Sequence, residues 1–127
     1  MHSFYFHDEH HLFRKSLRDF LDKEIVPEID QWEENGRVSK SAFKKMGEMG
    51  YYGLGMDEKY GGVNTDVFYT IILIEELNKC NSGGTAASLL AHSTLAMEHL
   101  QKNGNDFLKT NYLKPAINGD LIGCLAI

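Results

Sequence analysis

The chain has 127 residues, of which 43% are hydrophobic and 24% are charged, and its 13 basic and 18 acidic residues give a formal net charge of −5. This composition is typical of one folded globular domain and excludes a disordered chain. The negative charge argues against nucleic acid or an anionic membrane surface as the main partner. No apolar run reaches the roughly 18 residues that a membrane-spanning helix requires.

Between Leu12 and Val26, apolar side chains recur at steps of three and four, which predicts one face of a first helix. Asp8 is its expected N-cap, because a carboxylate there can accept a hydrogen bond from a free amide of the first turn. Pro27 lacks a backbone donor and is expected to end or kink the helix. The apolar face continues for about one more turn, and Gly36 is expected to close the segment.

A second helix is predicted between Ser39 and Gly50. Ser39 suits the N-cap position, and Gly50 suits the left-handed residue that follows a helix end. The spacing of the apolar residues predicts that Phe43, Met46 and Met49 point inward.

A third helix, "VFYTIILIEELNKC" at residues 67–80, is apolar nearly all round and is therefore expected to be central. Either Thr65 or Asp66 is expected to cap it. Glu75 and Glu76 are adjacent and face different directions on a helix, so they do not form a catalytic pair of acids. Both are predicted to be solvated or to pair with basic groups.

A fourth helix at residues 85–103, "TAASLLAHSTLAMEHLQKN", is unusually rich in small side chains and is expected to end at Gly104. Asn105 is the expected N-cap of a fifth helix at residues 106–118. Pro115 is expected to disturb the last turn of that helix. The pattern predicts an all-α fold, a bundle of about five helices.

The pattern changes after Gly119, which is expected to end the fifth helix. The run "LIGCLAI" at residues 121–127 is continuous, apolar and of strand length, yet no strand partner precedes it. An isolated strand cannot satisfy its backbone groups. The sequence therefore predicts a helical domain over residues 1–120, with residues 121–127 as the first strand of a β-domain that this chain lacks.

Five segments, taken in order, resemble the N-terminal helical domain of the acyl-CoA dehydrogenase family over essentially the whole chain. These segments are "IVPEIDQWEENG", "MGEMGYYGLGMDEKYGG", "EELNKCN", "AHSTLAMEHLQKNGNDFLKTNYLKPAINGD" and "GCLAI". No single segment is diagnostic, but the ordered set is specific. One departure is Pro115, which stands one place later than the usual Tyr-Leu-Pro of the family.

The resemblance implies an enzyme that dehydrogenates acyl-CoA thioesters between the α- and β-carbons. It implies FAD as the cofactor, an electron-transfer flavoprotein as the electron acceptor, and a homotetrameric parent. The catalytic glutamate of the family lies in the C-terminal domain, so no catalytic residue is predicted in this chain. The chain alone is therefore expected to be inactive and not to retain FAD.

The resemblance also implies a substrate-binding surface on the fourth helix, formed by Ala91, His92, Leu95 and Ala96. These residues have the spacing i, i+1, i+4 and i+5, and the family uses this stretch to line the acyl-chain tunnel. Small side chains leave room for an alkyl chain. Close packing between helices explains the same composition equally well.

The resemblance places Leu125 and Ile127 beside the flavin ring, as cofactor-binding residues, and ordinary strand packing is the alternative. His92 has no nucleophile or carboxylate placed beside it, so it is predicted to be a packed, hydrogen-bonded residue and not a catalytic base.

Two further sets of residues bear on metals and location. The histidines near the N-terminus, His7, His10 and His11, have no further ligand at useful spacing; they are predicted to be solvated, and no metal site is predicted. The two cysteines, Cys80 and Cys124, fit no metal or redox spacing. The N-terminal sequence is acidic and lacks the pattern of a signal peptide, so a cytoplasmic location is expected.

A second interpretation is a self-contained helical binding or adaptor module without catalysis, with the alanine-rich fourth helix as a groove for a partner. The apolar run at residues 121–127 argues against this interpretation. A complete helical module is not expected to contain a strand whose backbone groups have no partner.

Overall fold

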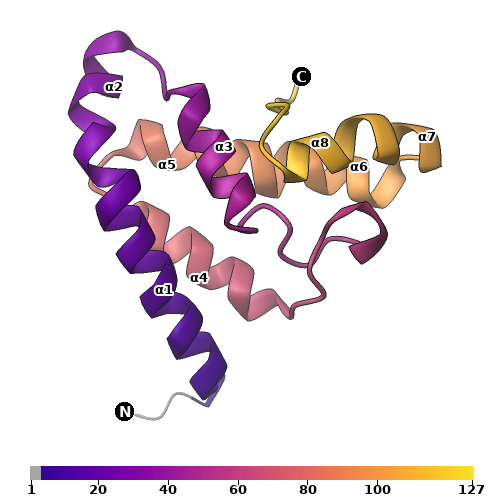
Figure 1. The fold of residues 1–127 in the computed structure, drawn as a ribbon, viewed down its shortest axis with the longest axis horizontal. Coiled ribbons are helices and arrows are strands. Elements are labelled where there is room, and N and C mark those ends of the chain that lie inside the picture. The colour runs from indigo at the N-terminus through magenta and orange to yellow at the C-terminus, as the bar shows by residue number, and fades with distance from the viewer. Residues whose placement is uncertain (1–3) are drawn as a thin grey trace.

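The computed structural model describes residues 4–127, and these residues form helices joined by loops, with no β-strand among them. The α-helices are α1 (Asp8–Glu24), α2 (Ile29–Asn35), α3 (Lys40–Glu48), α4 (Val67–Asn78), α5 (Gly83–Leu90), α6 (Glu98–Asn103), α7 (Asp106–Leu108) and α8 (Lys114–Ile117). Helices α1 and α4 lie side by side, while α6 and α8 lie together at the opposite end of the molecule (Figure 1). The predicted all-α class is confirmed.

The first helix begins one residue earlier than predicted, because His7 and not Asp8 is the N-cap of α1. Pro27 lies in a short 3₁₀ turn, Val26–Glu28, that links α1 to α2, so the predicted interruption is confirmed. Gly36 ends α2 with a φ of 68°, in the left-handed region where glycine carries no steric penalty.

A buried carboxylate joins α1 to α4. Glu76 on α4 is 2% exposed, and its carboxylate accepts hydrogen bonds from Arg14 Nη1 at 2.7 Å and Arg18 Nε at 2.8 Å. Lys79 Nζ lies 2.6 Å from the same carboxylate. Burial opposes the charged form of Glu76, but the hydrogen bonds from Lys79, Arg14 and Arg18 outweigh it and lower its pKa to about 2.

The predicted partnership of the two acids with basic groups is confirmed, because Glu75 also pairs with Arg14, at 2.6 Å. Solvation, the other predicted alternative, is wrong for Glu76, because its side chain is buried against the two arginines of α1. The helix α4 is less central than predicted: Ile72, Leu73 and Leu77 are buried, but Val67 and Ile74 are exposed.

A second contact between α1 and α4 involves His10, which is completely buried although it was predicted to be solvated. Its Nε2 lies 3.1 Å from Asp66 Oδ2, and its ring packs 4.7 Å from the ring of Tyr69. Asp66 also caps α4 by accepting a hydrogen bond from the Phe68 N–H at 2.9 Å. Its predicted capping role is confirmed.

The other two histidines of this region, His7 and His11, are exposed as predicted. Within residues 4–127, no group of His, Cys, Asp or Glu side chains is placed to hold a metal ion. No helix in this part of the chain is both long enough and apolar enough to cross a bilayer.

The helix α3 begins at its predicted cap, since Ser39 Oγ accepts a hydrogen bond from the Ser41 N–H at 3.2 Å. Phe43 and Met46 are buried as predicted, but Met49 is 52% exposed. Met49 is the C-cap residue, so it has left the inward face of the helix. The following Gly50 has a φ of 80°, as its position predicts.

The predicted fourth helix is a continuous rod formed by α5, a π-helical segment, Ala91–Met97, and α6. A π-helix has one residue more per hydrogen-bonded turn than an α-helix. Hydroxyl groups bond to carbonyls on this rod: Thr94 donates to the Leu90 carbonyl at 2.8 Å, and Ser93 lies 3.4 Å from the Leu89 carbonyl.

The predicted fifth helix is likewise formed by α7, a π-helical segment, Lys109–Leu113, and α8. Pro115 has no N–H to give to the carbonyl four residues earlier, and the wide segment lies directly before it. The irregular turn therefore precedes the predicted one, because the last turn, α8, is regular α-helix with Pro115 near its start. Asn105 caps the first turn by accepting the Leu108 N–H at 2.9 Å, and Gly119 ends the helix with a φ of 73°.

The last residues, 121–127, do not form a strand. The described part of the chain contains no strand with which they could pair, which is the physical reason. Their predicted role as a first strand therefore depends on residues outside this chain.

Candidate functional site

The four residues of the predicted substrate surface all lie in the π-helical segment Ala91–Met97. Such segments are rare in proteins, but where one is found it frequently lies at a functional site. The structure does not place the four side chains on one surface, however. Ala91 and Leu95 lie on the outer side, whereas His92 points into the core and Ala96 faces the C-terminal segment.

His92 is completely buried and its hydrogen bonds are satisfied by the backbone. Its Nε2 lies 3.0 Å from the Ala116 carbonyl oxygen, and the Gly123 N–H donates to its Nδ1 at 2.9 Å. Its ring meets the rings of Tyr52 and Phe43 edge to face, with centroids 4.4 and 5.7 Å away. Burial lowers the pKa of the imidazole, although the hydrogen bond to Ala116 opposes this.

The prediction that His92 is packed and hydrogen-bonded is confirmed. The prediction that it shares a surface with Ala91 and Leu95 is wrong, because it follows Ala91 directly and neighbouring helix residues face different directions.

Ala96 lies where the C-terminal segment crosses the helix. A Cβ atom added to Gly123 would come 2.9 Å from the Ala96 methyl group, so both residues must be small for the two segments to approach this closely. Close packing, which the sequence left open as an explanation, accounts for Ala96.

Ala91 and Leu95 remain as outward apolar residues one turn apart on this segment. Leu95 is 50% exposed, and Ala91 is partly exposed. Their side chains can contact an apolar ligand laid across the helix, whereas those of His92 and Ala96 support the helix from behind.

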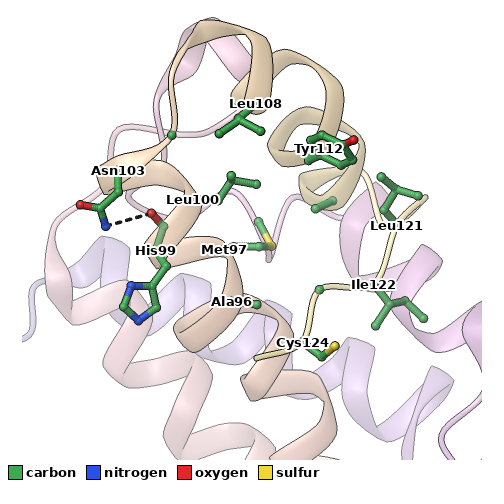
Figure 2. Close-up of a pocket in the computed structure, with 13 residues that line it drawn as sticks. Ala96, Met97, His99, Leu100, Asn103, Leu108, Tyr112, Leu121, Ile122 and Cys124 are labelled. Atoms are coloured by element: carbon green, nitrogen blue, oxygen red, sulfur yellow. Dashed lines mark hydrogen bonds between the residues drawn. The ribbon is translucent and has the colours of Figure 1, made fainter. Parts of the chain in front are cut away.

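An apolar groove of about 560 Å³ lies between the α5–α6 rod, the α7–α8 helix and the C-terminal segment, and its lining includes Ala96 but neither Ala91 nor Leu95. Figure 2 shows Met97 and Leu100 from the rod, Leu108 and Tyr112 from the α7–α8 helix, and Ile122 and Cys124 from the C-terminal segment around the groove. The remaining lining residues are Ala96, His99, Asn103, Gly104, Ala116, Leu121 and Gly123.

The chemistry of this groove is that of a binding surface. No Asp, Glu, Lys or Arg is among its lining residues, and the His99 ring points away from it (Figure 2). The free thiol of Cys124 is exposed there. The groove therefore offers apolar contact and contains no pair of groups suited to acid–base catalysis.

Of the residues that line the groove, sequence reasoning predicted only Ala96; those it missed include Leu100, Leu108 and Tyr112. Leu108 and Tyr112 are four residues apart and both are exposed, which is a detectable helical pattern. Leu100 has no such signal, because the sequence does not show how far the π-helical segment rotates the helix that follows it.

The predicted cofactor-binding residues lie beyond Gly123. Leu125 is 39% exposed and Ile127 is fully exposed. Within residues 4–127, no hydrogen bond involves the backbone of residues 124–127. The exposed apolar side chains of Leu125 and Ile127 can pack against the face of a planar ring system, so they fit a neighbouring flavin.

Comparison with known proteins gives a consistent result. The family model described as "Acyl-CoA dehydrogenase, N-terminal domain" matches residues 7–120. The long-chain specific acyl-CoA dehydrogenase of Sus scrofa mitochondria is 31% identical over 122 residues, which are 96% of this chain and 28% of that protein. The chain thus spans about three-tenths of the length of the curated relatives it matches.

Solved structures share the fold. The crystal structure of an acyl-CoA dehydrogenase from Geobacillus kaustophilus matches with a TM-score of 0.84 and 35% identity, over 95% of this chain and 31% of that one. An acyl-CoA dehydrogenase complexed with FAD from Bacillus anthracis matches with a TM-score of 0.85 and 28% identity, over 94% of this chain and 20% of that one. The chain therefore belongs to the acyl-CoA dehydrogenase family, of which it represents the N-terminal domain.

Proposed function

We propose that this chain is the N-terminal part of an FAD-dependent acyl-CoA dehydrogenase that oxidises acyl-CoA thioesters between the α- and β-carbons. The observation that carries the proposal is the match to the family model over residues 7–120, together with the shared fold. An adaptor module without catalysis is not favoured, because the relatives that match nearly the whole chain are acyl-CoA dehydrogenases.

Within such an enzyme this chain provides walls and no catalytic base. Ala91 and Leu95 contact the alkyl chain of the substrate and exclude water from it. Leu125 and Ile127 lie beside the flavin. When bound, FAD supplies the hydride acceptor for this chemistry.

The division of the chain into a helical domain at residues 1–120 and the first strand of a β-domain at residues 121–127 belongs to the same proposal. So do a homotetrameric parent, an electron-transfer flavoprotein as the partner, and a cytoplasmic location. The two free cysteines, Cys80 and Cys124, suit a reducing compartment.

The test compares two preparations, the complete product of the gene and the 127-residue chain. We expect the complete product to retain FAD, whose absorption band acyl-CoA bleaches under anaerobic conditions while the substrate loses two hydrogens. We expect the 127-residue chain, mixed with FAD and desalted, to retain none. A complete product without flavin, or one that acyl-CoA does not bleach, contradicts the proposed activity. A yellow 127-residue chain contradicts the predicted division of the site.

The substrate surface has its own test, the replacement Ala91→Phe in the complete product. The added ring is expected to block the far end of the alkyl-chain site and to leave the thioester end free. Each buried methylene contributes about 0.8 kcal/mol, so the loss of four costs roughly 3 kcal/mol. This corresponds to about a hundredfold decrease in kcat/KM for a long acyl-CoA relative to a short one.

The short acyl-CoA and the thermal unfolding midpoint are the controls. If Ala91 only packs against another helix, kcat/KM should fall equally for both substrates, or the protein should unfold at a lower temperature. An unchanged ratio in a well-folded variant removes Ala91 from the substrate surface.

A further inference from the structure

The imidazole of His92 connects α8 to the C-terminal segment, because its two ring nitrogens bond to backbone groups of Ala116 and Gly123. The carbonyl oxygen of Ala116 can only accept, so the nitrogen 3.0 Å from it, Nε2, must carry the proton. The Gly123 N–H can only donate, so Nδ1, which lies 2.9 Å from it, must be unprotonated. The two contacts together specify one tautomer of the neutral ring.

The surroundings of His92 favour this neutral form. The ring is completely buried, and burial lowers its pKa. Among the described residues, Tyr52 is the titratable group in contact with the ring, from the loop after α3. Helix α3 contributes the uncharged Phe43, while α8 and the C-terminal segment contribute the backbone of Ala116 and Gly123.

Gly123 is the last residue of the chain with a hydrogen bond to the rest of residues 4–127. Upstream of it, the ion pair between Lys44 and Asp120, at 2.6 Å, fixes the turn at the end of α8. Downstream, residues 124–127 have neither hydrogen bonds nor a partner strand. The direction in which this apolar end leaves the helical domain is therefore set at Gly123.

We propose that His92 is a positioning residue: its neutral imidazole holds Gly123 against α8 and thereby sets the position of Leu125 and Ile127 beside the flavin. The flavin part of this inference rests on the proposed function. His92 touches neither substrate nor cofactor and acts only through Gly123. Protonation of Nδ1 would place two N–H groups face to face and release the segment.

Two variants of the 127-residue chain test the contact. His92→Phe keeps a ring of similar shape but removes both polar contacts, and His92→Gln keeps one donor and one acceptor without titrating. The measurement is the hydrogen-exchange protection of the Gly123 amide as a function of pH. The matched control is the Gly119 amide, which donates to the same Ala116 carbonyl without involving the imidazole.

In the unmodified chain we expect Gly123 protection at neutral pH and its loss as the pH falls through the imidazole pKa, below 6.5. In His92→Phe the protection should not change with pH and should be about fivefold to tenfold lower than in the unmodified chain at neutral pH. In His92→Gln the protection should return without pH dependence. Imidazole ¹⁵N shifts should report a protonated Nε2. A flat Gly123 profile in the unmodified chain, the other tautomer, or an equal loss at Gly119 and Gly123 overturns the proposal.

The flavin part is measured in the complete product as the dissociation constant for FAD. We expect it to rise about tenfold in His92→Phe, which corresponds to about 1.4 kcal/mol, and to recover in His92→Gln. Equal FAD affinity in all three proteins overturns the link to the flavin. A complete product that never contains flavin contradicts the proposed function, and the proposed effect of His92 on the flavin then fails as well. The hydrogen-exchange profile of Gly123 still tests whether His92 holds Gly123.

Discussion

Replacing Gly119 with alanine is expected to lower the free energy of unfolding by about 3 to 4 kcal/mol, for two independent reasons. Gly119 has a φ of 73°, where a residue with a Cβ atom pays about 1–2 kcal/mol. The new Cβ would also overlap the carbonyl group of Phe43 and lie 2.8 Å from the Lys44 Cα. Both are backbone atoms of α3, so they cannot move aside as a flexible side chain would.

Gly50→Ala is the matched control, because Gly50 has a similar φ of 80° but no atom lies within 4 Å of the position that its new Cβ would take. It should cost only the conformational part, about 1–2 kcal/mol. Urea unfolding of both variants gives the difference, which we expect to be about 2 kcal/mol. Equal losses would show that the contact between α3 and Gly119 relaxes freely.

The second large effect is expected for Glu76→Gln, which should lower the free energy of unfolding by about 3 kcal/mol. The substitution keeps the shape of the side chain but leaves Arg14, Arg18 and Lys79 without their shared negative charge. We expect the lower end of the range for buried pairs, because both arginines are about a quarter exposed. The control is Glu75→Gln, whose exposed pair with Arg14 should contribute less than about 1 kcal/mol.

The same carboxylate predicts a pH dependence. The pKa of Glu76 falls from 4.5 to about 2 on folding, so the folded state binds its proton less readily than the unfolded state. The stabilisation from Glu76 is therefore fully present above pH 4.5 and is lost as the pH falls through about 2. Unfolding free energies measured across this window should fall less steeply in Glu76→Gln than in the unmodified chain. Parallel curves would contradict the charged state of Glu76.

Helix ends could be predicted from the sequence because they depend on neighbouring residues. The caps Ser39, Asp66 and Asn105 act on amides two or three residues away, and Gly36 and Gly119 have backbone conformations that favour glycine. These interactions are local, so a single sequence contains the information that decides them.

Burial of polar side chains could not be predicted in the same way. His10 meets Asp66, and Glu76 meets Arg14 and Arg18, across 56 to 62 residues of intervening chain. A charged residue in an amphipathic pattern is exposed more often than buried. Only the packing of α1 against α4 shows that these particular side chains lie inside and in contact.

The candidate site was predicted in part. The sequence selects one segment of the fourth helix through its small residues and the resemblance, but the four side chains of that segment point to different surroundings. Two contacts determine these different surroundings: His92 accepts a hydrogen bond from Gly123, and the Ala96 methyl group packs against the same glycine. Both depend on the path of the C-terminal segment, which the sequence describes only as an apolar run.

The carboxylate of Glu76 also has a consequence for how α1 and α4 align along their length. Arg14 and Arg18 stand one turn apart on α1 and bind the same group. A slide of about 5.4 Å in one direction would bring Asp22 to the place of Arg18, with its negative charge against Glu76.

A slide in the other direction would bring His10 to the place of Arg14 and separate it from Asp66. Apolar side chains alone tolerate such one-turn shifts with modest loss, because their contacts have little directionality. The buried carboxylate and its cations therefore specify a single register of the two helices, and this register determines where every other residue of α1 meets its neighbours.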